Sequence, residues 1–73
     1  MTEAERLNKI SGLNTLCEAI RSEHARMTDW LIYAENLQCN LETRVKLREC
    51  ERALAVAYVN ATDEWEKVKN ETS

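Results

Sequence analysis

The segment ENLQCNLET, residues 35–43, decides between two folds for this chain. Asn36 and Asn40 are poor residues inside a helix and good ones at its ends, because their side chains compete for backbone hydrogen bonds. We therefore expect a turn over residues 36–41, with Asn40 capping a second helix. No proline occurs in the chain and no glycine lies in this segment, so a single long helix in an intermolecular coiled coil remains the alternative.

The stretches on either side of this turn are typical of helices, since Ala, Leu, Glu, Lys and Arg recur in both. Thr2 and Glu5 form a capping-box pattern, so we expect the first helix over residues 3–36 and the second over residues 41–69. Gly12 costs about 1 kcal/mol relative to alanine. The soft spot at residues 11–14 could therefore separate a short frayed N-terminal helix from one that begins at Leu13. The predicted fold is all-α: a single domain, residues 1–73, forming an antiparallel, coiled-coil-like two-helix hairpin.

Apolar residues recur with a seven-residue period in both helices, and we expect heptad positions a, d and e to face the other helix. In the first helix Leu13, Ile20, Met27 and Ala34 take a, Leu16, Trp30 and Leu37 take d, and Ile10, Cys17, His24 and Leu31 take e. In the second, Leu47, Leu54, Ala61 and Val68 take a, Cys50 and Ala57 take d, and Tyr58 and Trp65 take e.

The composition indicates a soluble cytoplasmic protein that binds neither nucleic acid nor membrane. The formal net charge is -3, so there is no general attraction to phosphate, and no apolar run approaches the length of a membrane span. The N-terminus has no apolar signal region. The three cysteines match no zinc pattern. We expect them to be reduced, with Cys39 the most exposed.

No group of residues carries a catalytic pattern, so we expect neither an enzyme nor a cofactor. His24 is the only histidine and lies beside Glu23, without a second metal ligand or a nucleophile at helical spacing. Arg44, Arg48 and Arg52 follow one side of the second helix, but glutamates are interspersed among them. That pattern favours a solvated, ion-paired face over a nucleic-acid site.

The segment RALAVAYVN, residues 52–60, contains an uninterrupted apolar run from residue 53 to residue 59. Such a run is apolar on every side of a helix, and a hairpin has no third element to cover the side facing away from its partner helix. An exposed apolar patch of this kind indicates an interaction surface, and arginine is common at the rims of such surfaces. We name the predicted partner-binding residues the valine surface: Val45, Arg52, Ala55, Val56 and Val59. Its occupant is either another protein or a second copy of the chain, which would form a four-helix dimer acting as a small structural or regulatory protein. A third class, a small phage-like inhibitor, would bind through charges instead.

The segment ECERALAVAYVNATDEW, residues 49–65, resembles the closing helix of the small type III secretion co-chaperones, the YscE-like proteins. In that family a glutamate-rich start leads into an Ala/Ile/Val run with an aromatic residue near its end. The length, the acidity, the Met-Thr start and the hairpin plan also match, whereas the turn LQCNLET lacks the glycine expected there. The resemblance implies a cytoplasmic co-chaperone with a role in bacterial virulence. It would pair with a larger tetratricopeptide-like chaperone, and together they would keep the secretion needle subunit unpolymerised. Ala55, Val56 and Val59 would then lie in the surface that docks on the chaperone.

Overall fold

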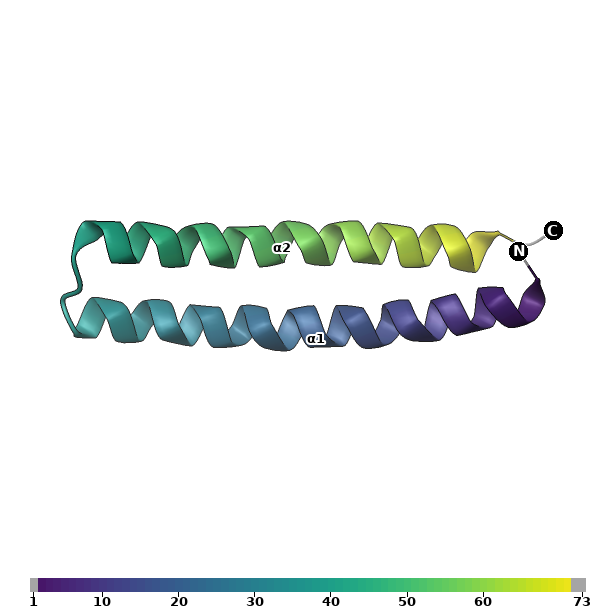
Figure 1. Ribbon diagram of the computed structural model, residues 1–73, viewed down its shortest axis with the longest axis horizontal. Helices are drawn as coiled ribbons and strands as arrows, with labels where there is room; N and C mark the ends of the chain where they lie inside the picture. Colours follow the sequence, from purple (N-terminus) through teal and green to yellow (C-terminus); the bar gives the residue numbers. More distant parts are fainter. Residues whose placement is uncertain (1, 72–73) are drawn as a thin grey trace.

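The computed structural model describes residues 2–71 as two antiparallel helices packed along their whole length (Figure 1). Helix α1 spans Glu3–Asn36 and α2 spans Leu41–Asn70. The molecule is a rod of 54 × 14 × 12 Å, with the start of α1 and the end of α2 at the same end of the rod. The predicted all-α hairpin is confirmed, and the alternative of one long helix is wrong.

Helix α1 begins at Thr2, whose side-chain Oγ1 accepts a hydrogen bond from the Glu5 backbone N–H at 3.1 Å. Arg6 reinforces this start: its guanidinium lies 2.7 Å from a Glu3 carboxylate oxygen, and it donates to the Lys69 carbonyl of α2 at 3.4 Å. The hydrogen bond from Arg6 lowers the pKa of Glu3. This contribution is therefore present at neutral pH and is lost as the pH falls through the lowered pKa.

The soft spot at residues 11–14 does not break the first helix, so the expectation of a separate frayed piece before Leu13 is wrong. Gly12 stands on an open part of the helix surface, with no atom within 4 Å of where a Cβ would be. Ile10 and Leu13 on either side of it pack towards α2. We infer that this packing offsets the modest cost of one glycine.

The turn is a Schellman motif followed directly by a helix N-cap. The Cys39 N–H donates to the Ala34 carbonyl at 3.1 Å, and the Gln38 N–H donates to the Glu35 carbonyl at 3.0 Å. Gln38 has φ 57°, the left-handed conformation that glycine normally supplies at this position. The side chain of Asn40 then accepts from the Thr43 N–H at 2.9 Å. This is the cap expected from the sequence, and it starts α2 immediately after the reversal.

The helices meet along a seam in which residues alternate at spacings of three and four. Most of the predicted a and e positions are buried or half-buried in this seam, but Tyr58 at an e position is exposed, and so are most of the predicted d positions. Leu16, Trp30, Leu37 and Cys50 are exposed, because the true stripe is rotated away from them. Ala57 at another d position is half-buried. The buried or half-buried seam residues are Ile10, Leu13, Cys17, Ile20, His24, Met27, Leu31 and Ala34 on α1, and Arg44, Leu47, Glu51, Leu54, Ala61, Trp65 and Val68 on α2.

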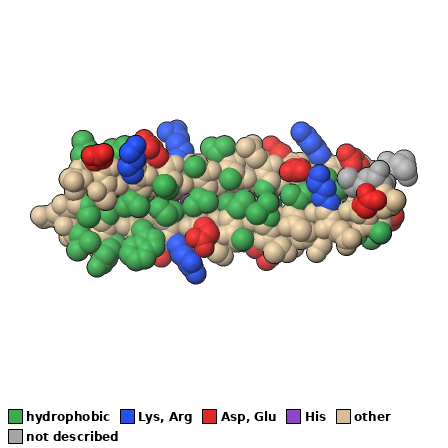
Figure 2. All heavy atoms as spheres, viewed as in Figure 1, with side chains coloured by type: hydrophobic (Ala, Val, Ile, Leu, Met, Phe, Trp, Pro, Cys, Tyr) green, Lys and Arg blue, Asp and Glu red, His purple; other side chains and the backbone are tan. Residues whose placement is uncertain are grey.

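The core of the hairpin is thin. Only Leu13, Ala34, Ala61 and Val68 are buried within residues 2–71, and none of the side chains described there is shielded completely from solvent. Figure 2 shows apolar side chains along the groove between the helices and a further group over the loop end of α1. Much of the apolar surface therefore faces solvent, and one chain alone leaves it uncovered.

Candidate functional site

The valine surface occupies one face of α2. Arg52, Ala55, Val56 and Val59 follow the spacing i, i+3, i+4, i+7, and Val45 lies two turns before Arg52, so all five share a face of the helix. Val56 is 54% exposed and Val59 is 56% exposed. Ala55 differs from the expectation: it is half-buried, because it borders the seam instead of facing away from α1. The surface is continuous and open along the middle of α2.

The charges around the valine surface are mixed, because the exposed Glu49 and Asp63 share this face of α2 with Arg52. Arg48 reaches across to Glu35 of α1, with 3.5 Å between nitrogen and oxygen. Neither Arg21 nor Arg52 has a carboxylate within ion-pair distance among residues 2–71. The sequence places Arg44 on the same side as Arg48 and Arg52, but in the structure Arg44 lies half-buried in the seam. Its Nε atom is buried and has no hydrogen-bond partner among the described residues.

His24 contacts Glu51 of α2, not its sequence neighbour Glu23. The His24 Nε2 and Glu51 Oε1 atoms are 2.6 Å apart, and about a third of each side chain is exposed. Glu23 instead pairs with Arg26 at 3.2 Å on the same helix. In the described part of the chain, no three His, Cys, Asp or Glu residues are grouped so that they could hold a metal ion. The His24–Glu51 pair joins the two helices.

The cysteines are placed differently from the expectation. Cys50 is exposed, whereas Cys39 is half-buried in the turn, so the prediction that Cys39 is the most exposed is wrong. Cys39 is shielded because the Schellman motif folds it back towards Ala34. Cys17 lies in the seam, with its Sγ 3.9 Å from the Thr62 Oγ1.

An exposed aromatic pair lies on α1, although the heptad pattern places Trp30 on the face that packs on α2. The rings of Trp30 and Tyr33 stand edge to face, 5.8 Å apart between centroids, and both are more than half exposed. Together with Arg26 and Asp29 they line a shallow hollow. Their i, i+3 spacing places both rings on one face of the helix.

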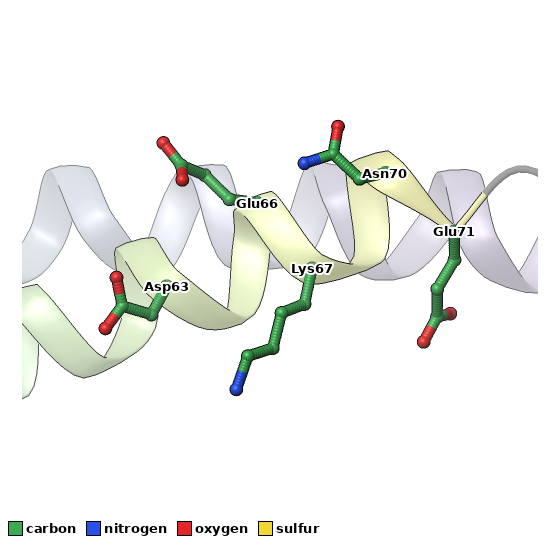
Figure 3. Close-up of a pocket in the computed structure, with 5 residues that line it drawn as sticks. All are labelled: Asp63, Glu66, Lys67, Asn70 and Glu71. Carbon is green, nitrogen blue, oxygen red and sulfur yellow. The ribbon is translucent and has the colours of Figure 1, made fainter.

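A second hollow lies at the C-terminal end of α2 and is polar. Figure 3 shows its lining side chains spreading in different directions into solvent, away from any common point. This arrangement has no convergent groups for catalysis. The lining residues are Asp63, Glu66, Lys67, Asn70 and Glu71.

Neither α1 nor α2, the two helices within residues 2–71, has a stretch long and apolar enough to cross a lipid bilayer. No protein-family model matches the sequence, and no curated protein or solved structure shows significant similarity to it.

Proposed function

We propose that this chain is a non-enzymatic protein-binding module whose valine surface binds a helix of another protein. The observation that carries this proposal is the exposure of Val56 and Val59 in the middle of α2, in a hairpin whose core is already thin. Burying large apolar side chains against a partner stabilises the complex by about 25 cal/mol for each Å² of apolar area removed from water. A partner helix laid along α2 would supply that cover.

The charges near the valine surface define the chemistry of the partner. Of the arginines beside the valine surface, Arg48 pairs with Glu35, whereas Arg21 and Arg52 have no ion pair among residues 2–71. His24 and Glu51 lie at the same height, and this register puts Arg21 level with Leu54, next to Ala55. The fitting partner is therefore an amphipathic helix with an apolar stripe and with carboxylates placed to meet Arg21 and Arg52, because complementary charges select and orient such contacts.

In its specific form, the proposal is a cytoplasmic co-chaperone of the YscE-like kind. The partner would be a chaperone built from tetratricopeptide-like helical repeats, and the pair would hold a type III secretion needle subunit in a soluble, unpolymerised state. The support for this form is the resemblance of residues 49–65 to the closing helix of that family, together with the hairpin fold. The open face of Val56 and Val59 fits docking on the concave side of a helical repeat.

Photo-cross-linking in cells tests where the partner binds. A photoreactive phenylalanine derivative at position 56 should cross-link to a helical-repeat protein identified by mass spectrometry. The same derivative at position 22, where Ser22 is exposed on α1, should not. Cross-links from position 56 to the chain's own copy would instead support the self-associating alternative, and cross-links from position 22 alone would contradict the proposal.

Titration of the purified partner then tests the role of the surface. Val56→Glu places a charge at the centre of the valine surface and should weaken binding by about tenfold or more, equivalent to about 1.4 kcal/mol. Ser22→Glu adds the same charge on α1 and should leave the affinity unchanged. Circular dichroism of both variants establishes that the helices persist. Equal binding by Val56→Glu and the unmodified chain would exclude the valine surface and favour recognition through charges.

A further inference from the structure

Helix α1 carries a second exposed stripe, separate from the seam and from the valine surface. Its residues alternate at spacings of three and four, so they share one face of the helix. Gly12 extends the stripe at one end and Leu37 at the other. All are exposed, and the stripe ends in the apolar group over the loop end of α1 (Figure 2). We call Leu16, Ala19, Glu23, Arg26, Trp30 and Tyr33 the α1 stripe.

The charges of the α1 stripe are complementary to those of the same stripe running in the opposite direction. An antiparallel copy centred between residues 24 and 25 brings Glu23 of one chain to Arg26 of the other, and the reverse contact forms by symmetry. These two residues already pair within one chain at 3.2 Å. In the dimer they would form a four-membered cluster of alternating sign at the centre of the contact.

The side-chain sizes are complementary about the same point. In this register Ala19 faces Trp30 of the second copy, and Leu16 faces its Tyr33. Gly12 faces Leu37 of the copy, and the space beside Gly12 is open, with no atom within 4 Å of a Cβ position. Small residues opposite large ones allow two helices to interdigitate, which is the arrangement that helix packing requires.

Helix α2 permits the same symmetric contact. The His24–Glu51 contact shows that the centre of the α1 stripe is level with residue 51 of α2. The ion pair between Lys9 and Glu64, at 3.2 Å, marks which side of each helix belongs to this flank, because residues seven apart share a side. At the level of the centre, α2 shows two small side chains on that flank, Cys50 and Ala53, with Lys46 and Ala57 beyond them on either side.

We propose that two copies of this chain pair antiparallel through the α1 stripe, about a two-fold axis between residues 24 and 25, to form a four-helix bundle. Every neighbouring pair of helices is then antiparallel, as in common bundles. From Gly12 to Leu37 the contact is about 38 Å long, and two helices side by side are about 20 Å wide. That gives about 750 Å² per chain, near the ~800 Å² per partner of a stable interface. The valine surface lies on the opposite flank and stays open, so this pairing does not depend on the partner proposed for it.

Charge reversal in the full chain tests this pairing by sedimentation equilibrium. The unmodified chain should sediment at twice its single-chain mass of 8.5 kDa. Glu23→Arg or Arg26→Glu alone puts like charges opposite each other twice and should weaken dimerisation by about tenfold or more. Ala25→Arg, at the same height on the other flank, should leave the dimer intact.

Mixing the two reversed chains provides the decisive outcome. A mixture of Glu23→Arg with Arg26→Glu should form a heterodimer, because every contact at the centre is again between opposite charges. Recovery of the double mass in the mixture, and in neither variant alone, supports the pairing. A monomeric unmodified chain, a dimer that survives either reversal, or a mixture that stays monomeric would overturn it.

Discussion

The His24 Nε2 atom lies 2.6 Å from the Glu51 Oε1 atom and joins α1 to α2 near the middle of the hairpin. It is an ionisable pair in a seam whose other α1 members, between Ile10 and Ala34, are apolar or thiol side chains. A shift of one helix by a turn would leave both groups without this partner. A polar pair across a mainly apolar seam specifies the register of the two helices.

Removing one member of this pair should cost stability, whereas removing both should not. His24→Leu or Glu51→Leu alone should each lower the free energy of unfolding by about 1 kcal/mol, a modest value because both groups are about a third exposed. The double variant should be as stable as the unmodified chain or more so, since two leucines pack where two polar groups met. Urea unfolding at one fixed chain concentration measures all four proteins. Simple addition of the two single effects would contradict a direct contact.

Gln38→Gly should stabilise the hairpin. Gln38 holds φ 57°, which costs a residue with a side chain about 1 kcal/mol and costs glycine almost nothing. We expect the free energy of unfolding to rise by at most about 1 kcal/mol, because the larger conformational entropy of glycine in the unfolded chain offsets part of the gain. Gln38→Ala keeps the strained backbone and should bring no gain. Thermal unfolding of both variants tests the left-handed turn, and equal melting temperatures would argue against it.

Trp65→Phe should be tolerated unusually well. The Trp65 Nε1 is buried and has no hydrogen-bond partner among the described residues, so the indole carries an unsatisfied donor. Phenylalanine removes that donor and keeps most of the ring, so we expect stability within about 1 kcal/mol of the unmodified chain. Trp65→Ala should lose about 2 kcal/mol, below the usual range because the ring is only half-buried. Chemical denaturation of the two variants separates the contribution of the indole N–H to stability from the contribution of the ring. A loss for Trp65→Phe as large as for Trp65→Ala would indicate a hydrogen bond in solution.

The fold could be predicted because its decisive signals are local. Asn40 and Thr2 are caps that act within their own turn, and both hydrogen bonds occur where the sequence indicates them. The left-handed turn at Gln38 could not be predicted in the same way. Glutamine has no preference for positive φ, and the turn forms there because the packing of the helices requires a reversal.

The orientation of the helices about their own axes was only partly predictable. Leu16 and Trp30 are as apolar as the residues that are buried, so composition does not distinguish the seam from a second stripe beside it. The cross-helix contact of His24 with Glu51 settles the rotation, and it joins residues 27 positions apart. The exposure of the valine surface could be predicted from the number of helices, because two packed helices leave the outer side of each one uncovered. The partner proposed for that side would be defined by the surface of another chain, which this sequence does not contain.

The central claim is that another polypeptide completes the thin core of this hairpin. The most direct measurement is the midpoint of urea unfolding, followed by circular dichroism on the purified chain at a series of micromolar concentrations. Binding to the folded state stabilises it by mass action, so we predict a midpoint that rises with chain concentration and rises further when the partner is added. A cooperative transition with the same midpoint at every concentration, unmoved by any helical partner, would show that the single hairpin is sufficient and contradict the account.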